Sequence, residues 1–311
     1  MGRGAAVLDR LGLSEADLPD TQLRLDEPMA RHTTNRLGGP ADVFARPGTR
    51  DDLAALLAAA HAAGVPVTFV GGGTNLLVRD GGIRGLVVNL ARLRAVERTG
   101  PATVHAEAGA STGRVLARCR AFGLSGVEFL AGVPGTMGGG VVMNAGTFLG
   151  EFKDVVVRVT SLTRAGEVRT RPADACGFRY RASDLPADEV VVSMDLALRP
   201  APAEVIDAAV ERLRAHRRAR EPHGVPNNGS TFKNPPGDYA GRLIEAAGLK
   251  GLRIGGAVVS PVHANWLVVD PKADPPCRAA DLVALIERVR TAVAKRFGVR
   301  LDLEVRILGE P

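Results

Sequence analysis

Two glycine-rich segments offer the backbone chemistry that an anionic ligand requires. The first, from Val70 to Leu76, reads VGGGTNL and runs from an apolar strand pattern into three consecutive glycines. Successive glycines adopt backbone angles closed to other residues, so their N–H groups can turn inward on a phosphate. An ordinary tight turn is the alternative. The residues that this loop presents to a ligand are Gly71, Gly72, Gly73, Thr74, Asn75 and Leu76.

The second segment, from Gly132 to Gly146, holds six glycines in fifteen residues. Glycine costs chain entropy on folding, so packing alone is a poor reason for this density, whereas a flat or phosphorylated ligand lying on the backbone would account for it. Neither segment fits GxGxxG or GxxxxGK[ST], so a dinucleotide here would not bind in the Rossmann manner. The residues singled out are Gly132, Val133, Pro134, Gly135, Gly138, Gly139, Asn144, Ala145 and Gly146.

A polar loop, Asn228 to Pro235, groups three different functional side chains in the sequence NGSTFKNP. Ser230 supplies a hydroxyl beside a glycine, where a ligand can approach closely. Lys233 and Asn234 suit a phosphate, a carboxylate or a sugar hydroxyl. A polar turn without a ligand is the alternative.

Two further segments carry charged groups among apolar or aromatic residues. Phe178 to Ser183 reads FRYRAS, and arginine beside aromatic residues is typical of carboxylate or phosphate recognition, although it is also common on surfaces. Glu304 lies in an apolar strand pattern near the C-terminus. It is either an outward-facing surface residue, which the alternation favours, or a buried acid with a function.

One segment matches a sequence motif of serine hydrolases. Gly109 to Gly113 matches GxSxG between a predicted strand and a predicted helix, and His263 lies downstream. Serine is also a favoured helix N-cap, and no HGGG-type oxyanion loop precedes the motif. We therefore favour a cap role for Ser111 over a nucleophilic one.

The composition indicates an ordinary globular protein with a basic surface. The chain has 311 residues, 45% hydrophobic and 24% charged, with a formal net charge of +6 and a pI of about 9.7. Its arginines are spread along the chain, and the densest run lies in a predicted helix at residues 203–219. A solvated arginine-rich face and an anionic small ligand therefore explain the charge better than nucleic acid does.

The cysteines and the apolar runs of the sequence indicate the cellular compartment in which the protein works. Cys119, Cys176 and Cys277 fit neither a disulfide framework nor a zinc site, so we expect no metal and idle thiols in a reducing compartment. No signal-peptide core and no apolar run of roughly 18 residues is present. We expect a cytoplasmic protein without a membrane segment.

The elements that must position these residues follow from periodicity. We expect a polar, loosely ordered lead-in over residues 1–20 and helices at 49–64, 112–122, 203–219, 239–247 and 279–296. Expected strands cover 65–70, 86–90, 104–108, 155–162, 167–171, 190–198, 257–259, 265–269 and 301–308. Residues 199–202 (RPAP) read as a linker, after which the chain looks like a separate α+β unit.

The ordered set of motifs resembles one known family, the UDP-N-acetylenolpyruvoylglucosamine reductases. The resemblance covers about residues 25–309, and its specific parts are GSTFKNP and the paired glycine loops. The motifs, in order, are HTT, GGPA, GGGTNLLV, AGVPGTMGG, NAG, CGFRYRAS, NGSTFKNP, AGRLIEAAGLKG, HANW and LDLEVRILG.

The resemblance implies an α+β protein with the two-subdomain FAD-binding fold of the vanillyl-alcohol-oxidase type, followed by an α+β substrate-binding domain. The FAD-binding domain would span 21–200, with subdomains of about 21–92 and 93–200, and the substrate domain 203–311. FAD would bind noncovalently, with its pyrophosphate at Gly71–Leu76 and its flavin near Gly132–Gly146. NADPH would reduce the flavin, and a UDP-sugar would then occupy the same site.

The resemblance also assigns roles to individual residues. Ser230 matches the donor of a proton to the α-carbon, while Arg181 and Glu304 match the residues that stabilise an enolate-like intermediate. The positions that match substrate contacts are Tyr180, Lys233, Asn234 and His263. The expected reaction is the NADPH-dependent reduction of UDP-N-acetylglucosamine enolpyruvate to UDP-N-acetylmuramate in peptidoglycan precursor synthesis.

Several positions depart from the family pattern. The segment between Ser183 and Val190 is short, which places the chain in the subgroup without a tyrosine-bearing lid loop. Asn35 stands where an aromatic residue often follows HTT, and Asn227-Asn228 stand where Ser-Ala is more usual. Val269 and Asp270 replace an asparagine that often ends the HANF strand.

Three other functions remain as alternatives. A flavin oxidase of small alcohols would share the fold, a serine hydrolase would use Ser111, and a nucleotide-binding protein would lack activity. Retention of Arg181, Ser230 and Glu304 together argues against lost activity. We expect a monomer that acts on NADPH and a UDP-sugar without nucleic acid, although the sequence leaves the oligomeric state open.

Overall fold

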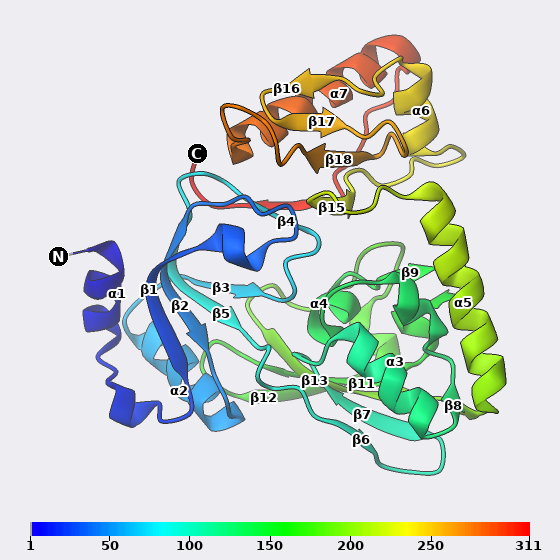
Figure 1. Ribbon diagram of the computed structural model, residues 1–311. Coiled ribbons are helices and arrows are strands. Elements are labelled where there is room, and N and C mark those ends of the chain that lie inside the picture. Colours follow the sequence, from blue (N-terminus) through cyan, green and yellow to red (C-terminus); the bar gives the residue numbers. More distant parts are fainter. Residues whose placement is uncertain (1) are drawn as a thin grey trace. The chain divides into compact units, whose positions relative to one another are not determined.

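The computed structural model describes residues 2–311, and its contacts divide them into two compact units (Figure 1). The first unit contains the chain up to Asp26, Asp42–Gly72 and Gly85–Arg217; the second contains Glu27–Ala41, Gly73–Arg84 and Arg218–Pro311. Each unit has a hydrophobic core of its own. Neither unit is continuous in the sequence, and the first glycine loop changes unit between Gly72 and Gly73.

The first unit begins with two helices and a four-stranded sheet. The sheet has the order β1-β2-β5-β3, with β1 at Gln22–Pro28, β2 at Pro40–Arg46, β5 at Ile83–Asn89 and β3 at Val67–Val70. Strands β3 and β5 run parallel, with Val67 opposite Leu86. Helix α2 (Arg50–Ala62) starts at Thr49, whose side chain accepts from the Asp52 N–H as predicted.

The lead-in differs from its prediction as a loosely ordered segment. Residues Arg3–Leu11 form helix α1, and Leu11 and Leu18 are buried in the first core. Met1 lies outside the described residues. Val7, Leu8 and Leu11 have the spacing of one helix face and pack on the first core, so the prediction overlooked an amphipathic pattern.

The rest of the first unit is built on a five-stranded antiparallel sheet. Its order is β12-β11-β13-β7-β6, with β12 at Val168–Pro172, β11 at Val156–Leu162, β13 at Val190–Ala197, β7 at Thr103–Glu107 and β6 at Val96–Arg98. Helices α3 (Thr112–Ala121) and α4 (Met137–Val142) lie on one side of it (Figure 1). The predicted hairpin of β11 and β12 is confirmed.

Short elements and one long helix complete this unit. Strand β8 (Leu124–Ser125) pairs with β14 (Arg199–Pro200), and β9 (Gly146–Thr147) pairs with β10 (Gly150–Glu151). Short 3-10 turns cover Glu15–Asp17, Glu128–Gly132, Phe152–Asp154 and Ala173–Cys176. The sequence predicts helix α5 (Ala203–Arg220) as part of the substrate domain, but the helix belongs to the first unit up to Arg217.

The second unit consists of an antiparallel sheet with two helices and a separate parallel strand pair. The sheet order is β15-β18-β17-β16, at Asn227–Ser230, Trp266–Val269, Ala257–Val259 and Arg253–Ile254. Helix α6 (Ala240–Ala246) and helix α7 (Ala279–Phe297) pack on it, and α7 buries Leu282, Leu285, Ile286, Val289 and Val293 as predicted. Met29–His32 forms a 3-10 turn.

Strand β4 (Leu76–Val78) pairs in parallel with β19 (Arg306–Leu308). The predicted strand over 301–308 is therefore wrong in its first half, because Glu304 precedes β19 and its N–H instead reaches the Thr231 carbonyl. Within residues 2–311, no helix is long and apolar enough to cross a bilayer.

Candidate active site

The two glycine loops meet within the first unit. Gly71 follows β3, and a Cβ built on it would lie 2.6 Å from Thr136 Oγ1. A Cβ on Gly72 would lie 2.8 Å from the Gly135 Cα. The carbonyl of Gly71 is held by buried Asn89, whose side-chain amide donates to it at 2.9 Å. The loops approach this closely because glycine has no side chain at the point of contact.

The meeting point carries backbone donors. None of the described residues accepts a hydrogen bond from the N–H groups of Gly71, Gly72 or Thr136. Thr136 is also the N-cap of α4, and its side chain makes no capping hydrogen bond. Unpaired N–H groups on two converging loops suit the oxygens of a pyrophosphate, so this part of the chain fits the expected FAD.

From the sequence alone we attribute the glycines of the second loop to a ligand, but the protein's own packing explains most of them. A Cβ on Gly140 would lie 2.4 Å from the Phe152 ring, and one on Gly138 would lie 2.9 Å from the Ala108 Cβ. Gly139 is different, because its Cβ would meet only Thr136 Oγ1, at 3.6 Å. Glycine density alone therefore does not distinguish room for a ligand from room for a neighbouring side chain.

The Arg181 segment lies against the end of the second glycine loop. Arg179 and Ala182 exchange backbone hydrogen bonds, which closes a tight turn around Tyr180 and Arg181. The Arg181 guanidinium donates to the Gly146 carbonyl at 3.0 Å and lies 5.0 Å from the centre of the half-exposed Tyr180 ring.

Two residues of this region hold backbone angles that side chains other than glycine seldom adopt. Arg181 has φ 51° and the fully buried Asn144 has φ 40°. The Asn144 amide donates to the Arg179 carbonyl and accepts from the Lys153 N–H. Strained backbone held by surrounding hydrogen bonds is found at sites where the position of a side chain matters.

In the second unit, Ser230 and Glu304 are brought close through their backbones. Ser230 ends β15 and is half-buried, opposite Trp266 of β18. The next carbonyl, that of Thr231, accepts from the Glu304 N–H at 2.9 Å. Asn75, from the end of the first glycine loop, donates to the Glu304 carbonyl at 2.9 Å. Glu304 is half-buried, which differs from the outward-facing surface position that alternation favoured.

The predicted substrate contacts lie on the same unit but differ in exposure. Lys233 is half-buried, and its N–H donates to the Asp302 carbonyl. Asn234 is exposed, and its side-chain oxygen accepts from the Ala240 N–H at 3.1 Å, so it also supports the start of α6.

His263 Nδ1 accepts from the Asn265 N–H at 3.2 Å, which leaves the ring proton on Nε2. Burial lowers the pKa of His263. The imidazole is therefore neutral at pH 7 and presents one donor.

Sequence reasoning missed several asparagines that hold these segments. Asn265 is buried, accepts from the Phe232 N–H and donates to the Phe232 carbonyl, which fixes the residue two positions after Ser230. Asn35 and Asn228 are also buried and bind each other at 2.7 Å. The unusual identities of Asn35 and Asn228 were the only signal in the sequence.

The hydrolase alternative loses its support at Ser111. The Ser111 hydroxyl oxygen accepts from the Arg114 N–H at 3.2 Å and caps α3, as the favoured interpretation predicted. Among the other sequence predictions, the thiols of Cys119, Cys176 and Cys277 are free, and burial raises the pKa of Cys119 to about 12. That thiol is uncharged at neutral pH.

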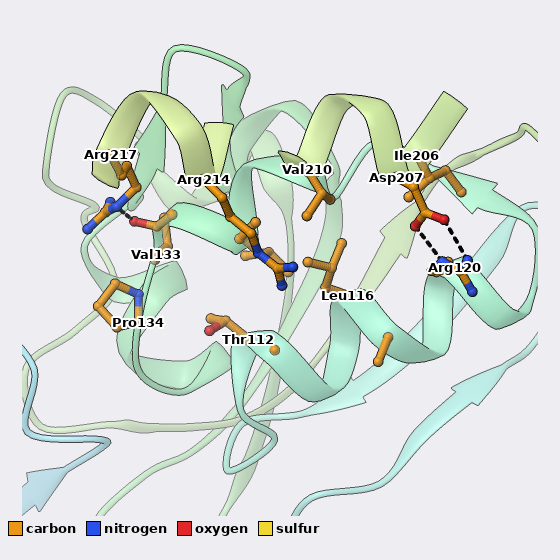
Figure 2. A pocket seen from close by; sticks show the side chains of 15 residues that line it. Thr112, Leu116, Arg120, Val133, Pro134, Ile206, Asp207, Val210, Arg214 and Arg217 are labelled. Carbon is orange, nitrogen blue, oxygen red and sulfur yellow. Dashed lines mark hydrogen bonds and ion pairs between the residues drawn. The ribbon is translucent and has the colours of Figure 1, made fainter. Parts of the chain in front are cut away.

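A cavity of about 500 Å³ lies in the first unit between α3, α5 and the start of the second glycine loop (Figure 2). Leu116 and Val210 face each other across it, and Arg214 extends into it from α5 (Figure 2). Arg217 donates to the Gly132 carbonyl and so ties the end of α5 to the loop. The cavity therefore borders Gly132, Val133 and Pro134 on the side of α5.

Comparisons with known proteins cover both parts of the chain. The family model described as UDP-N-acetylenolpyruvoylglucosamine reductase, C-terminal domain, matches residues 221–308, and the model of an FAD binding domain matches residues 41–171. UDP-N-acetylenolpyruvoylglucosamine reductase of Anaeromyxobacter dehalogenans is 48% identical over 285 residues, which is 92% of this chain and 85% of that protein.

Solved structures agree with these matches. The crystal structure of UDP-N-acetylenolpyruvylglucosamine reductase from Thermus caldophilus has a TM-score of 0.78 at 33% identity and covers 92% of this chain and 98% of its own. A berberine bridge enzyme variant in complex with (S)-reticuline has a TM-score of 0.51 at 14% identity, over 65% of this chain and 45% of its own, and this likeness concerns the fold alone.

The fold is therefore α+β, with the two-subdomain FAD-binding fold of the vanillyl-alcohol-oxidase type followed by an α+β substrate-binding domain, and the predicted cofactor, FAD, is confirmed. The identity extends through both the cofactor-binding and the C-terminal parts. The chain belongs to the UDP-N-acetylenolpyruvoylglucosamine reductase family.

Proposed function

We propose that this protein reduces the enolpyruvyl ether of UDP-N-acetylglucosamine enolpyruvate with NADPH and so forms UDP-N-acetylmuramate for peptidoglycan. The observation that carries this proposal is the 48% identity with a reductase of this name over 92% of the chain. The net reaction takes a hydride from NADPH and a proton from the protein or solvent, and it converts one C=C bond to a single bond. NADP⁺ leaves as the oxidised product.

Bound FAD would accept the hydride from NADPH and deliver it to the β-carbon of the enolpyruvyl group. The first glycine loop, Gly71–Leu76, would hold its pyrophosphate, and the N–H groups of Gly71, Gly72 and Thr136 in the first unit offer donors for it. The flavin would lie near Gly132–Gly146. The free donors at the meeting point of the two loops support this assignment.

Ser230 would give the proton that completes the reduction at the α-carbon. A serine hydroxyl is a weak acid, so the reaction requires a basic carbanion at the α-carbon and a hydroxyl fixed close to it. The half-burial of Ser230, between the hydrogen-bonded Thr231 and the Asn227–Gly229 turn, supports such a fixed position.

Arg181 and Glu304 would act on the carboxylate of the same intermediate. Hydride arrival at the β-carbon moves negative charge toward the carboxylate, and a guanidinium can meet it with a planar pair of donors. The strained backbone at Arg181 supports a positioning requirement at that residue. The hydrogen bond from the Glu304 N–H to Thr231 supports a role for Glu304 beside Ser230.

The remaining predicted contacts would bind the UDP-sugar. Lys233 supplies a positive charge for the diphosphate, and Asn234 and Tyr180 supply polar groups at exposed positions. The neutral His263 would donate from Nε2. NADPH and nucleotide sugars are ionic and do not cross bilayers, so we place the reaction in the cytoplasm, and we propose that a monomer carries it out.

The test is an anaerobic absorption spectrum of the purified protein, followed by NADPH and then by UDP-N-acetylglucosamine enolpyruvate. We expect flavin bands that bleach with NADPH and return with the UDP-sugar. Bleaching without return would keep the flavin chemistry and reject the substrate. A protein that takes up no FAD would reject the proposal altogether.

A further inference from the structure

Three segments that are distant in the sequence meet at one buried pair of amides in the second unit. Asn35 has no exposed surface, and Asn228 is 7% exposed. The Asn35 amide donates to Asn228 Oδ1 at 2.7 Å, and the Asn228 amide donates to the Leu76 carbonyl at 2.7 Å. The pair therefore joins the segment after HTT, the end of the first glycine loop and the strand that carries Ser230.

The hydrogen-bond partners of the pair determine which way each side-chain amide points. Asn35 Oδ1 accepts from the Leu37 N–H at 2.9 Å, so its NH₂ group must face Asn228. Asn228 must then present its oxygen to Asn35 and its NH₂ group to Leu76. Buried amides of this kind are costly when a partner is removed, because the remaining donor or acceptor has no water to bind.

The strand that carries Ser230 needs this support because its own ladder is interrupted. β15 pairs with β18 at Asn227 and at Ser230, with a register irregularity between them. Gly229, at φ 74°, lies in that gap, and a Cβ there would meet no atom within 4 Å. Side chains take over the role of the ladder, since Asn227 Oδ1 accepts from the Gly229 N–H and Asn228 binds Leu76.

The same connection reaches the glycine loop a second time through Thr34. Its N–H donates to the Gly73 carbonyl at 3.2 Å, and its hydroxyl donates to the Asn227 carbonyl at 2.7 Å. The loop that would hold the FAD pyrophosphate and the strand before Ser230 thus share two polar connections, in addition to the one that runs from Asn75 through Glu304 to Thr231 on the other side of Ser230.

We infer that Asn35 and Asn228 are positioning residues that couple the Gly73–Leu76 loop to Ser230, so that the loop position set by FAD fixes the hydroxyl for proton transfer. This inference rests on the proposed function.

The first test measures the connection without any turnover. We expect Asn228→Ala to raise amide hydrogen exchange in the apoprotein in both segments 73–78 and 229–232, and to weaken FAD binding, measured by fluorescence titration, about ten-fold. Val289→Ala removes a buried side chain from α7 in the same unit and serves as the control for lost stability. Faster exchange in only one of the two segments would overturn the coupling.

The second test separates positioning from stability in the half-reactions. With saturating FAD, Asn228→Ala should leave bleaching by NADPH unchanged, slow the return of the flavin bands with the UDP-sugar about ten-fold, and raise the solvent isotope effect on that return. Asn35→Ala should do the same, and the double variant should be no slower than the slower single variant, because both changes remove one connection.

Equal slowing of both half-reactions, or an equal effect of Val289→Ala at the same melting temperature, would reduce the pair to a structural role. If Asn228→Ala does not fold, Asn228→Ser keeps a shorter donor and should give a smaller effect of the same kind. A wild-type protein whose flavin never responds to the UDP-sugar would reject the proposed function, while the exchange and titration results would still decide the coupling.

Discussion

The two units hold their candidate site residues in different ways. In the first unit, the backbone forms the site, because glycines let two loops approach until a Cβ on Gly72 would lie 2.8 Å from Gly135. In the second unit, asparagine side chains hold irregular segments in place around Ser230 and Glu304.

The difference follows from what each part must do. A pyrophosphate binds many N–H groups at once, which only bare backbone supplies densely. A proton donor requires one side chain at one position, which buried hydrogen bonds define better than apolar packing does. The comparison predicts that changes to the Ser230 and Glu304 side chains affect the chemistry, whereas changes in the loops of the first unit affect stability or FAD binding.

The largest expected effect is that of Ser230→Ala. We expect reoxidation of the flavin by the UDP-sugar to slow about 10²- to 10⁴-fold, because general acid catalysis contributes rate factors of this size. Bleaching by NADPH and FAD content should not change. Stopped-flow absorbance of the two half-reactions measures this, and a normal rate of reoxidation would reject the proton-donor role.

Glu304→Gln should act on the same half-reaction with a smaller effect. We expect a loss of about 10²-fold, in line with removal of one group that stabilises transition-state charge. The FAD content of the purified variant provides the control, since the Glu304 backbone, which binds Asn75 and Thr231, is retained. Loss of FAD would make Glu304 a structural residue. It would also contradict the contrast between Glu304, which we assign to the chemistry, and the glycine loops, which we assign to FAD binding.

In the first unit, Gly140→Ala should destabilise the fold. The new methyl group would lie 2.4 Å from the Phe152 ring, which is fully buried. Overpacking of this kind costs about 1–3 kcal/mol in the free energy of unfolding. Urea denaturation of the apoprotein measures it, and an unchanged midpoint would show that the loop can move to accept the methyl group.

Gly139→Ala is the matched change, with the smallest expected effect on stability. Its methyl group would meet only Thr136 Oγ1, at 3.6 Å, and alanine favours the helix by up to about 1 kcal/mol. The apoprotein should be as stable as the wild type or slightly more so. If this glycine faces FAD, the dissociation constant for FAD should rise about ten-fold by the same overpacking argument, whereas an unchanged constant would show that FAD lies elsewhere.

Local patterns in the sequence were sufficient for much of the fold. The face of α7, the hairpin of β11 and β12 and the caps at Thr49 and Ser111 were all predicted, because residues within one or two turns determine them. The glycine loops and the NGSTFKNP segment also supplied most of the candidate site residues, whose roles stay predictions.

Only the tertiary structure decided what those residues do in space. The space beside Gly140 is filled by the Phe152 ring and not by a ligand. Glu304 lies before a strand and not within it. Asn35 and Asn228, which are 193 positions apart in the sequence, form a hydrogen bond. Periodicity reports which side of an element faces the core, but it carries no information about which distant backbone fills a missing side chain or satisfies a buried amide. Those partners are fixed only when the segments pack.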